Sequence, residues 1–269
     1  MPEIASLTSL IDYITHHPEE GIPIPEELGG GYYWKLDEYH WITYEMTGSG
    51  VRFTDMRLPG SCPSSLPHSG QLAGVVLAAG PKTVHGLPTV IASADGEPAV
   101  VKVVKNLRSS GVRHIIVVTG YMAESVQDAI CDCLGKEIGS AYWLQIVQNS
   151  KYALGLYSSL RAGLRLVPPY FDGVLMAFGD QPQVSPTVLN HLTQSFREGA
   201  RIVTPAFAGR RGHPMLIGRE FLRHSFSDRQ RGPSYLLRRF RNSVKDVEVS
   251  DPNILRSVPS HAHTTLKQG

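Results

Sequence analysis

Between residues 71 and 205 the sequence alternates short apolar runs with amphipathic segments, whose apolar positions recur at helical spacing. Short continuous apolar runs are typical of strands buried on both faces of a parallel sheet, and helical spacing is typical of helices packed on it. We expect strands in "LAGVVLAAG" (72–80), "HIIVVTG" (114–120), "YWLQIVQN" (142–149), "GVLMAFGDQP" (173–182) and "RIVTP" (201–205). We expect helices over residues 96–112, 122–134, 156–167 and 185–199. Repeated units of this kind predict an α/β fold, a three-layer α/β/α sandwich with a mostly parallel sheet.

Residues 1–58 have a different pattern, which predicts a small α+β appendage. The stretch "LTSLIDYITHH" (7–17) has helical spacing, and an aromatic and β-branched run over residues 32–58 surrounds a Gly-Ser-Gly turn, as in a β-hairpin. Residues 59–70 have the composition of a linker, which leads to a second domain over residues 71–269. Four aromatic residues of the appendage fit either a ligand-stacking face or, as we favour, packing in a small core. They are Trp34, Tyr39, Trp41 and Tyr44.

The charge of the chain is divided unevenly between these two parts. Residues 1–70 contain 10 acidic and 3 basic side chains, whereas residues 71–269 contain 14 acidic and 23 basic ones. The positive field therefore belongs to the second domain, where it would favour an anionic ligand, and the acidic appendage is a candidate surface for a protein partner. The basic residues are scattered and accompany no stacking-aromatic platform, so we do not expect nucleic-acid binding.

Composition and cysteine content point to a folded protein in a reducing compartment. The chain of 269 residues is 42% hydrophobic and 19% charged, and no apolar run approaches the length needed to cross a bilayer. A cytoplasmic protein without a membrane partner is the expectation. Three cysteines, Cys62, Cys131 and Cys133, cannot all pair. We interpret Cys131 and Cys133 as packing residues of a helix rather than as metal ligands.

Several polar or small residues follow the expected strands directly. Gly80, Gly120, Asn149 and Asp180 each come at the end of an apolar run. Because ligands of open α/β sheets bind at the carboxyl ends of the strands, these positions are expected to surround one site.

A series of motifs supports this expectation. They are "LAAG" (77–80) with "GLP" (86–88) and "GEP" (96–98), "GVRHIIVVTGY" (111–121), "QNSKYALGLYSSLRAGL" (148–164), "FGDQPQVSP" (178–186) and "GRRGHPMLIG" (209–218). In this order and spacing, the region from about Leu72 to Pro259 resembles the MobA-like nucleotidyltransferases, which include molybdenum-cofactor cytidylyltransferases. The resemblance implies a nucleotide-diphospho-sugar transferase-like fold, and the first 70 residues lie outside it.

The resemblance also implies roles for individual residues. CTP or GTP would be the nucleotide substrate, and a phosphorylated pterin such as molybdopterin would be the acceptor. Asp180 resembles the magnesium-binding aspartate of the family, and Lys82 is a candidate second catalytic residue. The positions expected to hold the nucleotide are Leu77, Ala78, Ala79, Gly80, Gly86, Asn149, Gly155, Ser158 and Ser159. The loop expected to face the acceptor holds Arg211, Gly212 and His213.

Each of the polar positions also has a structural interpretation. Asp180 fits a residue that caps the turn before Pro182, although we favour the metal. Ser158 and Ser159 fit capping residues at the start of a helix. His213 fits an ordinary loop histidine, and Gly80 fits a strand-to-helix turn under either interpretation.

The sequence departs from the family pattern mainly at charged positions. Val84, His85 and Thr89 stand where the family has Arg, Met and Lys, and Lys82 stands where it has Ser. Near the C-terminus the family has a second metal-binding carboxylate after a strand, whereas "ILRSVPS" places Pro259 there.

Other cations are candidates for the missing charges. Besides Lys82 and His85 they are Arg210 and Arg211, in a stretch (197–241) with 11 Arg or Lys against 3 acids, which equally fits a solvated basic surface.

The sequence therefore leaves two hypotheses open. One is an active, magnesium-dependent nucleotidyltransferase that uses a rearranged set of cations. The other is a catalytically degenerate relative that retains the fold for nucleotide binding, regulation or scaffolding.

Overall fold

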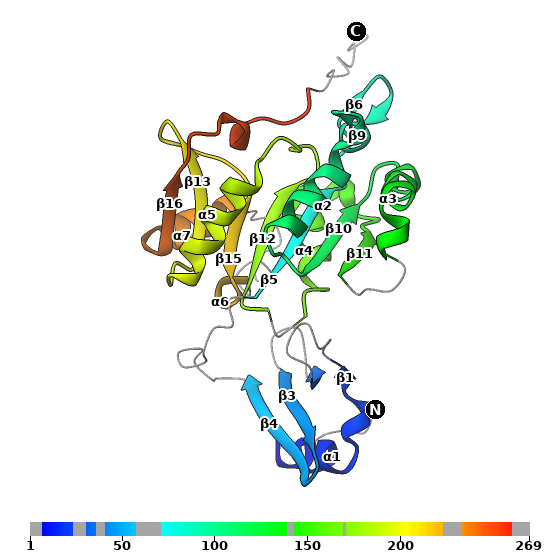
Figure 1. Ribbon diagram of the computed structural model, residues 1–269, viewed down its shortest axis with the longest axis vertical. Coiled ribbons are helices and arrows are strands. Elements are labelled where there is room, and N and C mark those ends of the chain that lie inside the picture. Colours follow the sequence, from blue (N-terminus) through cyan, green and yellow to red (C-terminus); the bar gives the residue numbers. More distant parts are fainter. Residues whose placement is uncertain are drawn as a thin grey trace. The chain divides into compact units, whose positions relative to one another are not determined.

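The computed structural model describes residues 7–23, 31–35, 41–57, 71–138, 143–168, 171–222 and 233–259 (Figure 1). The chain divides into two compact units, one formed by Met1–Pro67 with Pro168–Tyr170 and the other by the remaining residues. The expected linker, residues 59–70, lies outside the described residues.

The N-terminal unit is a 4-stranded antiparallel sheet with one helix. The strands are β1 (Ile22–Pro23), β2 (Tyr32–Lys35), β3 (Trp41–Thr47) and β4 (Gly50–Arg57), in the order β1-β2-β3-β4, and the helix is α1 (Leu7–His16). The expected helix and hairpin both form.

The apolar stripe of α1 supplies Leu10 and Ile14 to the core of this unit. They pack against Ile42 and Tyr44 of β3, and Trp34 lies against the same cluster. Tyr44 and Trp34 therefore pack in a small core, as favoured from the sequence. Tyr39 and the side chain of Trp41 lie outside the described residues.

The second unit is built on an 8-stranded sheet with the order β11-β10-β5-β12-β15-β13-β14 and with β16 paired to β13 (Figure 1). Strands β11, β10, β5 and β12 run parallel, β15 runs antiparallel to both β12 and β13, and β16 runs parallel to β13. The strands are β5 (Leu72–Ala78), β10 (His114–Thr119), β11 (Leu144–Gln148), β12 (Gly173–Phe178), β13 (Ile202–Phe207), β14 (Arg210–Arg211), β15 (Met215–Gly218) and β16 (Val244–Glu248). All five expected strands form, and the predicted three-layer sandwich is confirmed.

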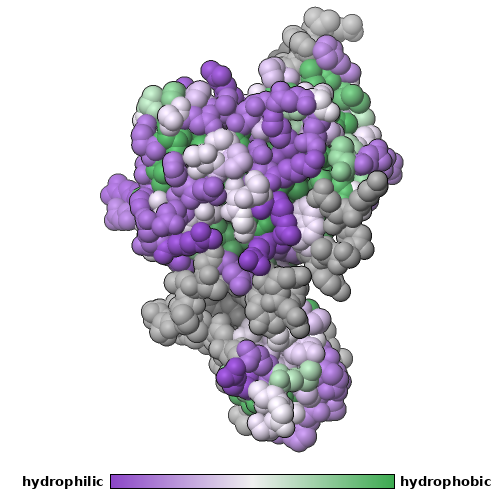
Figure 2. Space-filling model, in the orientation of Figure 1, coloured by the Kyte–Doolittle hydropathy of each residue, from purple (hydrophilic) through white to green (hydrophobic). Residues whose placement is uncertain are grey.

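Helices cover both faces of this sheet. The helices are α2 (Ala99–Ser109), α3 (Ala123–Ile138), α4 (Leu156–Leu164), α5 (Pro186–Arg197), α6 (Arg219–Leu222) and α7 (Pro233–Arg239). Helix α2 contacts both α3 and α5 on one face, and α4 packs on β5 and β10 from the other (Figure 1). Figure 2 shows the side on which α2, α3 and α5 lie, and its surface is predominantly hydrophilic, as expected for helices whose apolar stripes face a sheet.

The alternation of side chains along the central strands explains how both faces are packed. Val76 and Val117 belong to the core beneath α2 and α3. Their neighbours Val75 and Val118 point to the opposite face, where a Cβ added to Gly163 of α4 would lie 2.6 Å from Val75 and 2.9 Å from Val118. Because both faces of these strands are buried, apolar residues occupy successive positions along them. Each fully buried Val or Ile contributes about 1.5–3 kcal/mol to the stability of the fold.

The segment between β5 and α2 differs from the sequence expectation. A loop was expected between Gly80 and a helix that begins at residue 96, but two short hairpins and a 3₁₀ turn occupy this segment. They are β6 (Thr83–Val84) with β7 (Leu87–Pro88), η3 (Thr89–Ile91), and β8 (Ser93–Ala94) with β9 (Glu97–Pro98). Both hairpin turns have positive φ at their two central residues, 48° and 81° at His85 and Gly86 and 57° and 86° at Asp95 and Gly96. This is the pattern of a type I′ turn, in which Asp-Gly is a favoured pair.

The cysteines of α3 are not packing residues. Cys131 and Cys133 are both exposed, whereas their neighbours Ile130 and Leu134 are buried in the core, because the two cysteines flank the buried face of α3 on either side. Among the described residues, no helix is long and apolar enough to cross a membrane.

Candidate active site

The carboxyl ends of the central strands surround a cavity of about 250 Å³. Seven of the residues that we expected at a nucleotide or catalytic site line it. They are Leu77, Ala79, Gly80, Lys82, Gly155, Ser159 and Asp180. Sequence reasoning missed several other lining residues, among them Val90, Tyr152, Leu156 and Phe178, which carry no signature of their own. The bend after β5 and the turn after β12 thus face one common cavity.

Gly80 lies on the wall of this cavity, and backbone strain does not explain why this residue is a glycine. Its φ does not lie in the left-handed region, and a Cβ added there would meet no atom within 4 Å. The fold alone therefore does not require glycine at this position, contrary to our expectation for a strand-to-helix turn. The absent side chain instead leaves the backbone of the bend open to the cavity, as close approach of a ligand would need.

Gly86 and Ala78 do not line this cavity. Gly86 lies at the exposed turn of the β6–β7 hairpin, where φ of 81° favours glycine, and Ala78 is buried in the sheet. The hairpin nevertheless fixes Lys82 at its base, because the Thr89 N–H donates a hydrogen bond of 2.9 Å to the Lys82 carbonyl oxygen.

Asp180 lies in the turn after β12, with its side chain 10% exposed. Within the described residues, the one hydrogen bond of its carboxylate is the bond that it accepts from Lys82, with 3.3 Å between Lys82 Nζ and Asp180 Oδ2. The carboxylate therefore does not cap its own turn, and it faces the cavity together with a lysine.

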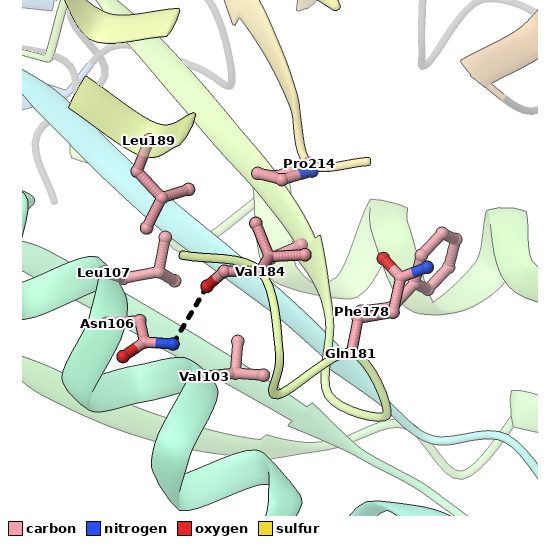
Figure 3. A pocket seen from close by; sticks show the side chains of 9 residues that line it. Val103, Asn106, Leu107, Phe178, Gln181, Val184, Leu189 and Pro214 are labelled. Atoms are coloured by element: carbon pink, nitrogen blue, oxygen red, sulfur yellow. Dashed lines mark hydrogen bonds between the residues drawn. The ribbon is translucent and has the colours of Figure 1, made fainter. Parts of the chain in front are cut away.

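The backbone of this turn is held from below by α2, as Figure 3 shows. Asn106 Nδ2 donates to the carbonyl oxygens of Val184, at 3.0 Å, and Pro182, at 3.3 Å. Beneath the turn, Asn106 and apolar side chains such as Leu107 enclose a cavity of only about 10 Å³. Close packing here leaves the turn little room to move, which holds Asp180 in position.

Asn149, Ser158 and Ser159 form one hydrogen-bonded network beside the cavity. Asn149 Nδ2 donates to Ser158 Oγ, at 2.9 Å, and to Ser159 Oγ, at 3.0 Å, and Asn149 Oδ1 accepts from the Lys151 N–H. The N-cap residue of α4 is Gly155, with φ of 96° and no side-chain cap. The two serines are therefore not helix caps, and of the network only Ser159 lines the cavity.

The expected acceptor loop places its three residues differently. Arg211 forms a bidentate ion pair with Asp246 of β16, at 2.7 and 2.9 Å, and does not line the cavity. This pair lowers the pKa of Asp246 and raises the pKa of Arg211. Gly212 packs against Ile254, since a Cβ added there would lie 2.4 Å from the Ile254 carbonyl oxygen. Arg211 and Gly212 therefore make structural contacts within the fold.

His213 lies next to a residue of the cavity wall. Its ring contacts the cavity-lining Phe178 edge-on, with 4.5 Å between the ring centroids, and its buried Nδ1 has no hydrogen-bond partner among the described residues. Burial lowers the pKa of His213, and the negative charge of Asp180 opposes this effect without cancelling it. The imidazole is therefore neutral at pH 7.

Because the pKa of His213 is lowered, the free energy of unfolding should depend on pH, and His213→Gln should weaken this dependence. The unfolded histidine takes up a proton below about pH 6.5, whereas the folded one resists protonation, so the free energy of unfolding falls as the pH drops below that value. One such group contributes a slope of at most about 1.4 kcal/mol per pH unit. Urea unfolding between pH 5 and pH 8 should give a flatter profile for His213→Gln than for the wild type. His191→Gln, at an exposed position on α5, is the control, and equal profiles for all three proteins would contradict the prediction.

The structure also shows where the departures from the family pattern lie. Thr89 is 2% exposed and lines the cavity, so the loss of a lysine there changes the site itself, whereas Val84 lies in the β6–β7 hairpin. Among the described residues lining the cavity, Lys82 is the one cation.

The segment "ILRSVPS", where the family pattern has a carboxylate after a strand, does not follow a strand directly. The last strand, β16, ends at Glu248, and η7 (Pro252–Leu255) follows it. The turn between them does hold a carboxylate, Asp251, but its oxygens accept from the Asn253 N–H at 2.9 Å and the Ser185 N–H at 3.4 Å. The Val258 N–H donates to the Asp180 carbonyl oxygen at 2.7 Å, so the segment before Pro259 does lie beside Asp180, without adding a carboxylate.

The region that forms the second unit is similar to known proteins. The family model of the MobA-like NTP transferase domain matches residues 74–246. The bifunctional protein GlmU of Syntrophomonas wolfei is 32% identical over 130 residues, which are 48% of this chain and 26% of that protein. The chain thus matches about a quarter of the length of this curated relative.

Solved structures give the same result. Rv0371c of Mycobacterium tuberculosis superposes with a TM-score of 0.55 at 25% identity, over 66% of this chain and 88% of that one. A second structure of Rv0371c is a complex with manganese. A nucleotidyl transferase from Methanothermobacter, Mth528, has a TM-score of 0.55 at 25% identity, over 68% of this chain and 90% of that one. The chain belongs to the MobA-like NTP transferase family.

Proposed function

We propose that the cavity binds a nucleoside triphosphate and that the protein transfers its nucleotidyl group to a phosphorylated acceptor. CTP or GTP is the proposed donor, and a molybdopterin-type small molecule is the proposed acceptor. The observation that carries the proposal is that the open bend at Gly80, with Lys82, faces Asp180 across one cavity. Such an arrangement offers backbone N–H groups and an ammonium to phosphates on one side and a carboxylate on the other.

The proposed reaction needs only a few groups from the chain. An oxygen of the acceptor phosphate attacks the α-phosphorus, the bond from that phosphorus to the bridging oxygen breaks, and pyrophosphate leaves with the bonding electrons. Lys82 would stabilise the negative charge on the phosphates, and Leu77, Ala79 and Ser159 would position the nucleoside. His213, neutral and next to Phe178, would border the acceptor.

The site supplies one carboxylate to a magnesium ion that substrate phosphates would also bind. The described residues contain no group of three or more His, Cys, Asp or Glu that would hold a metal ion by themselves. Magnesium, however, is commonly bound by one or two carboxylates together with substrate phosphates, and Asp180 supplies one carboxylate. Bound there, the ion would neutralise phosphate charge during transfer. The manganese complex of Rv0371c makes Mn²⁺ a second ion to test.

A second candidate function is a nucleotide-binding or regulatory protein without turnover. The observation that favours it is that Lys82 pairs with Asp180, while Thr89 stands on the cavity wall at the position where the family pattern has a lysine. In this case the acidic residues 1–58 are the proposed contact for a protein partner.

Pyrophosphate release distinguishes the two functions. Each of ATP, CTP, GTP and UTP is supplied with molybdopterin, in Mg²⁺, in Mn²⁺ and in a chelator. The transferase predicts release from one nucleotide that depends on both the acceptor and the metal. Binding of a nucleotide, measured by calorimetry, without release under any of these conditions would establish the second function instead.

A further inference from the structure

We propose that Lys82 acts as a built-in counter-cation at Asp180, so that a triphosphate binds in this cavity without a divalent metal. This inference rests on the proposed nucleotide site but concerns binding rather than transfer. It assigns to the ammonium the bridge between carboxylate and phosphate that a metal ion would otherwise form.

The geometry places the ammonium where such a bridge needs it. Lys82 Nζ lies 3.3 Å from Asp180 Oδ2, and both residues line the same cavity. An ammonium has three N–H donors, of which one points to Asp180, so two remain for phosphate oxygens. The side chain of Lys82 is 59% exposed while that of Asp180 is 10% exposed, so the ammonium lies on the open side of the carboxylate.

The backbone beneath Lys82 is fixed although its side chain is exposed. The Lys82 carbonyl oxygen accepts from the Thr89 N–H, and the neighbouring Thr83 pairs with Pro88 in the β6–β7 hairpin. A flexible four-carbon stem on a fixed base lets the ammonium keep its contact with Asp180 while it turns to a ligand.

A triphosphate that binds without a metal ion needs the positive charge of the Lys82 ammonium. A triphosphate that approaches Asp180 is repelled by the carboxylate unless a cation lies between them. The other candidate cations do not serve, because His85, Arg210 and Arg211 do not line the cavity and Arg211 is paired with Asp246. Among the described lining residues, Lys82 alone supplies positive charge.

The test is calorimetric titration of CTP and GTP in a chelator and in Mg²⁺, with wild type, Lys82→Met and Lys82→Arg. The wild type should bind the nucleotide in the chelator with an affinity within about threefold of that in Mg²⁺. Lys82→Met should lose at least about tenfold in the chelator and much less in Mg²⁺, because only there does a second cation replace the ammonium. Lys82→Arg, which keeps the charge, should retain metal-free binding.

The control is Lys102→Met, which removes a lysine paired with Asp95 outside the cavity and should leave both affinities unchanged. Thermal unfolding of each variant establishes that the fold is intact. Wild-type binding that disappears in the chelator, or an equal loss in both conditions for Lys82→Met, would overturn the inference.

A failure of the proposed nucleotide site gives a different result. If no nucleotide binds in either condition, the proposed function is wrong, and inorganic tripolyphosphate then tests the counter-cation by itself. Metal-free binding of tripolyphosphate that Lys82→Met abolishes would support the role of Lys82, and absence of this binding would reject it.

Discussion

Asp180→Asn is expected to reduce nucleotidyl transfer by at least about 10²–10³-fold while the protein remains folded. Asparagine has nearly the same shape as aspartate, and the backbone carbonyl of residue 180 still accepts its bond from Val258. What the substitution removes is the negative charge that faces Lys82 and that would hold a metal–phosphate complex. Pyrophosphate release with the active nucleotide, in Mg²⁺, measures the effect.

The same substitution should act in the opposite direction on metal-free binding. Without the carboxylate, a triphosphate meets the Lys82 ammonium and no repelling charge, so its affinity in a chelator should equal or exceed that of the wild type. A fall in turnover together with preserved or stronger metal-free binding is a combination that general misfolding does not produce.

Asp128→Asn, at an exposed carboxylate of α3, is the matched control and should change neither quantity. Unchanged turnover in Asp180→Asn would exclude a catalytic role for Asp180 and would favour a site that acts only in binding.

The parts of the fold that were predictable from the sequence are those set by burial. Strands such as β5 and β10 are buried along their whole length, so their apolar runs identify them without any tertiary information. The direction of these strands then places Gly80 and Asp180 at one edge of the sheet, because both follow parallel strands. This is why the common cavity was predictable although its residues are about a hundred positions apart.

The parts that were not predictable depend on local turns and on partners distant in sequence. The Asp95-Gly96 pair is a strong signal for the β8–β9 hairpin, whereas His85-Gly86 gives no such signal for the β6–β7 hairpin. The partner of Arg211 is Asp246, on a strand that follows much later, and no spacing rule connects the two residues. Strand β16 was not predicted because it is short and largely exposed, which gives it no apolar run.

The charges of the site illustrate a more general limit of sequence reasoning. Comparing positions one by one suggests a site that has lost cations at Val84 and Thr89. The structure adds that Lys82, in an unusual position, reaches Asp180 across the cavity. Whether a lost charge is replaced depends on which side chains converge in space, and a flexible lysine can reach a carboxylate from several backbone positions.

Gly120→Ala is expected to damage both the stability of the second unit and its nucleotide cavity. A Cβ at this position would lie 2.6 Å from Tyr152 Cβ, 2.8 Å from Ala79 Cβ and 2.9 Å from the Ala79 carbonyl oxygen. None of these atoms belongs to a flexible side-chain end, so the bend after β5 and the segment at Tyr152 must move apart. Overpacking of this kind typically costs about 1–3 kcal/mol of unfolding free energy.

Because Ala79 and Tyr152 both line the cavity, the same displacement should weaken nucleotide binding. Calorimetry should show an affinity at least about tenfold lower, since contacts that are lost or misplaced by 1 Å have effects of this size or greater. Gly135→Ala is the matched control, because residue 135 lies on α3 and an added Cβ there meets no atom within 4 Å. That control should bind normally and be more stable by about 0.5–1 kcal/mol, since alanine is the better helix former. If Gly120→Ala instead binds nucleotide as the wild type does, the ligand does not depend on the wall formed by Ala79 and Tyr152, and the cavity is not where the nucleotide binds.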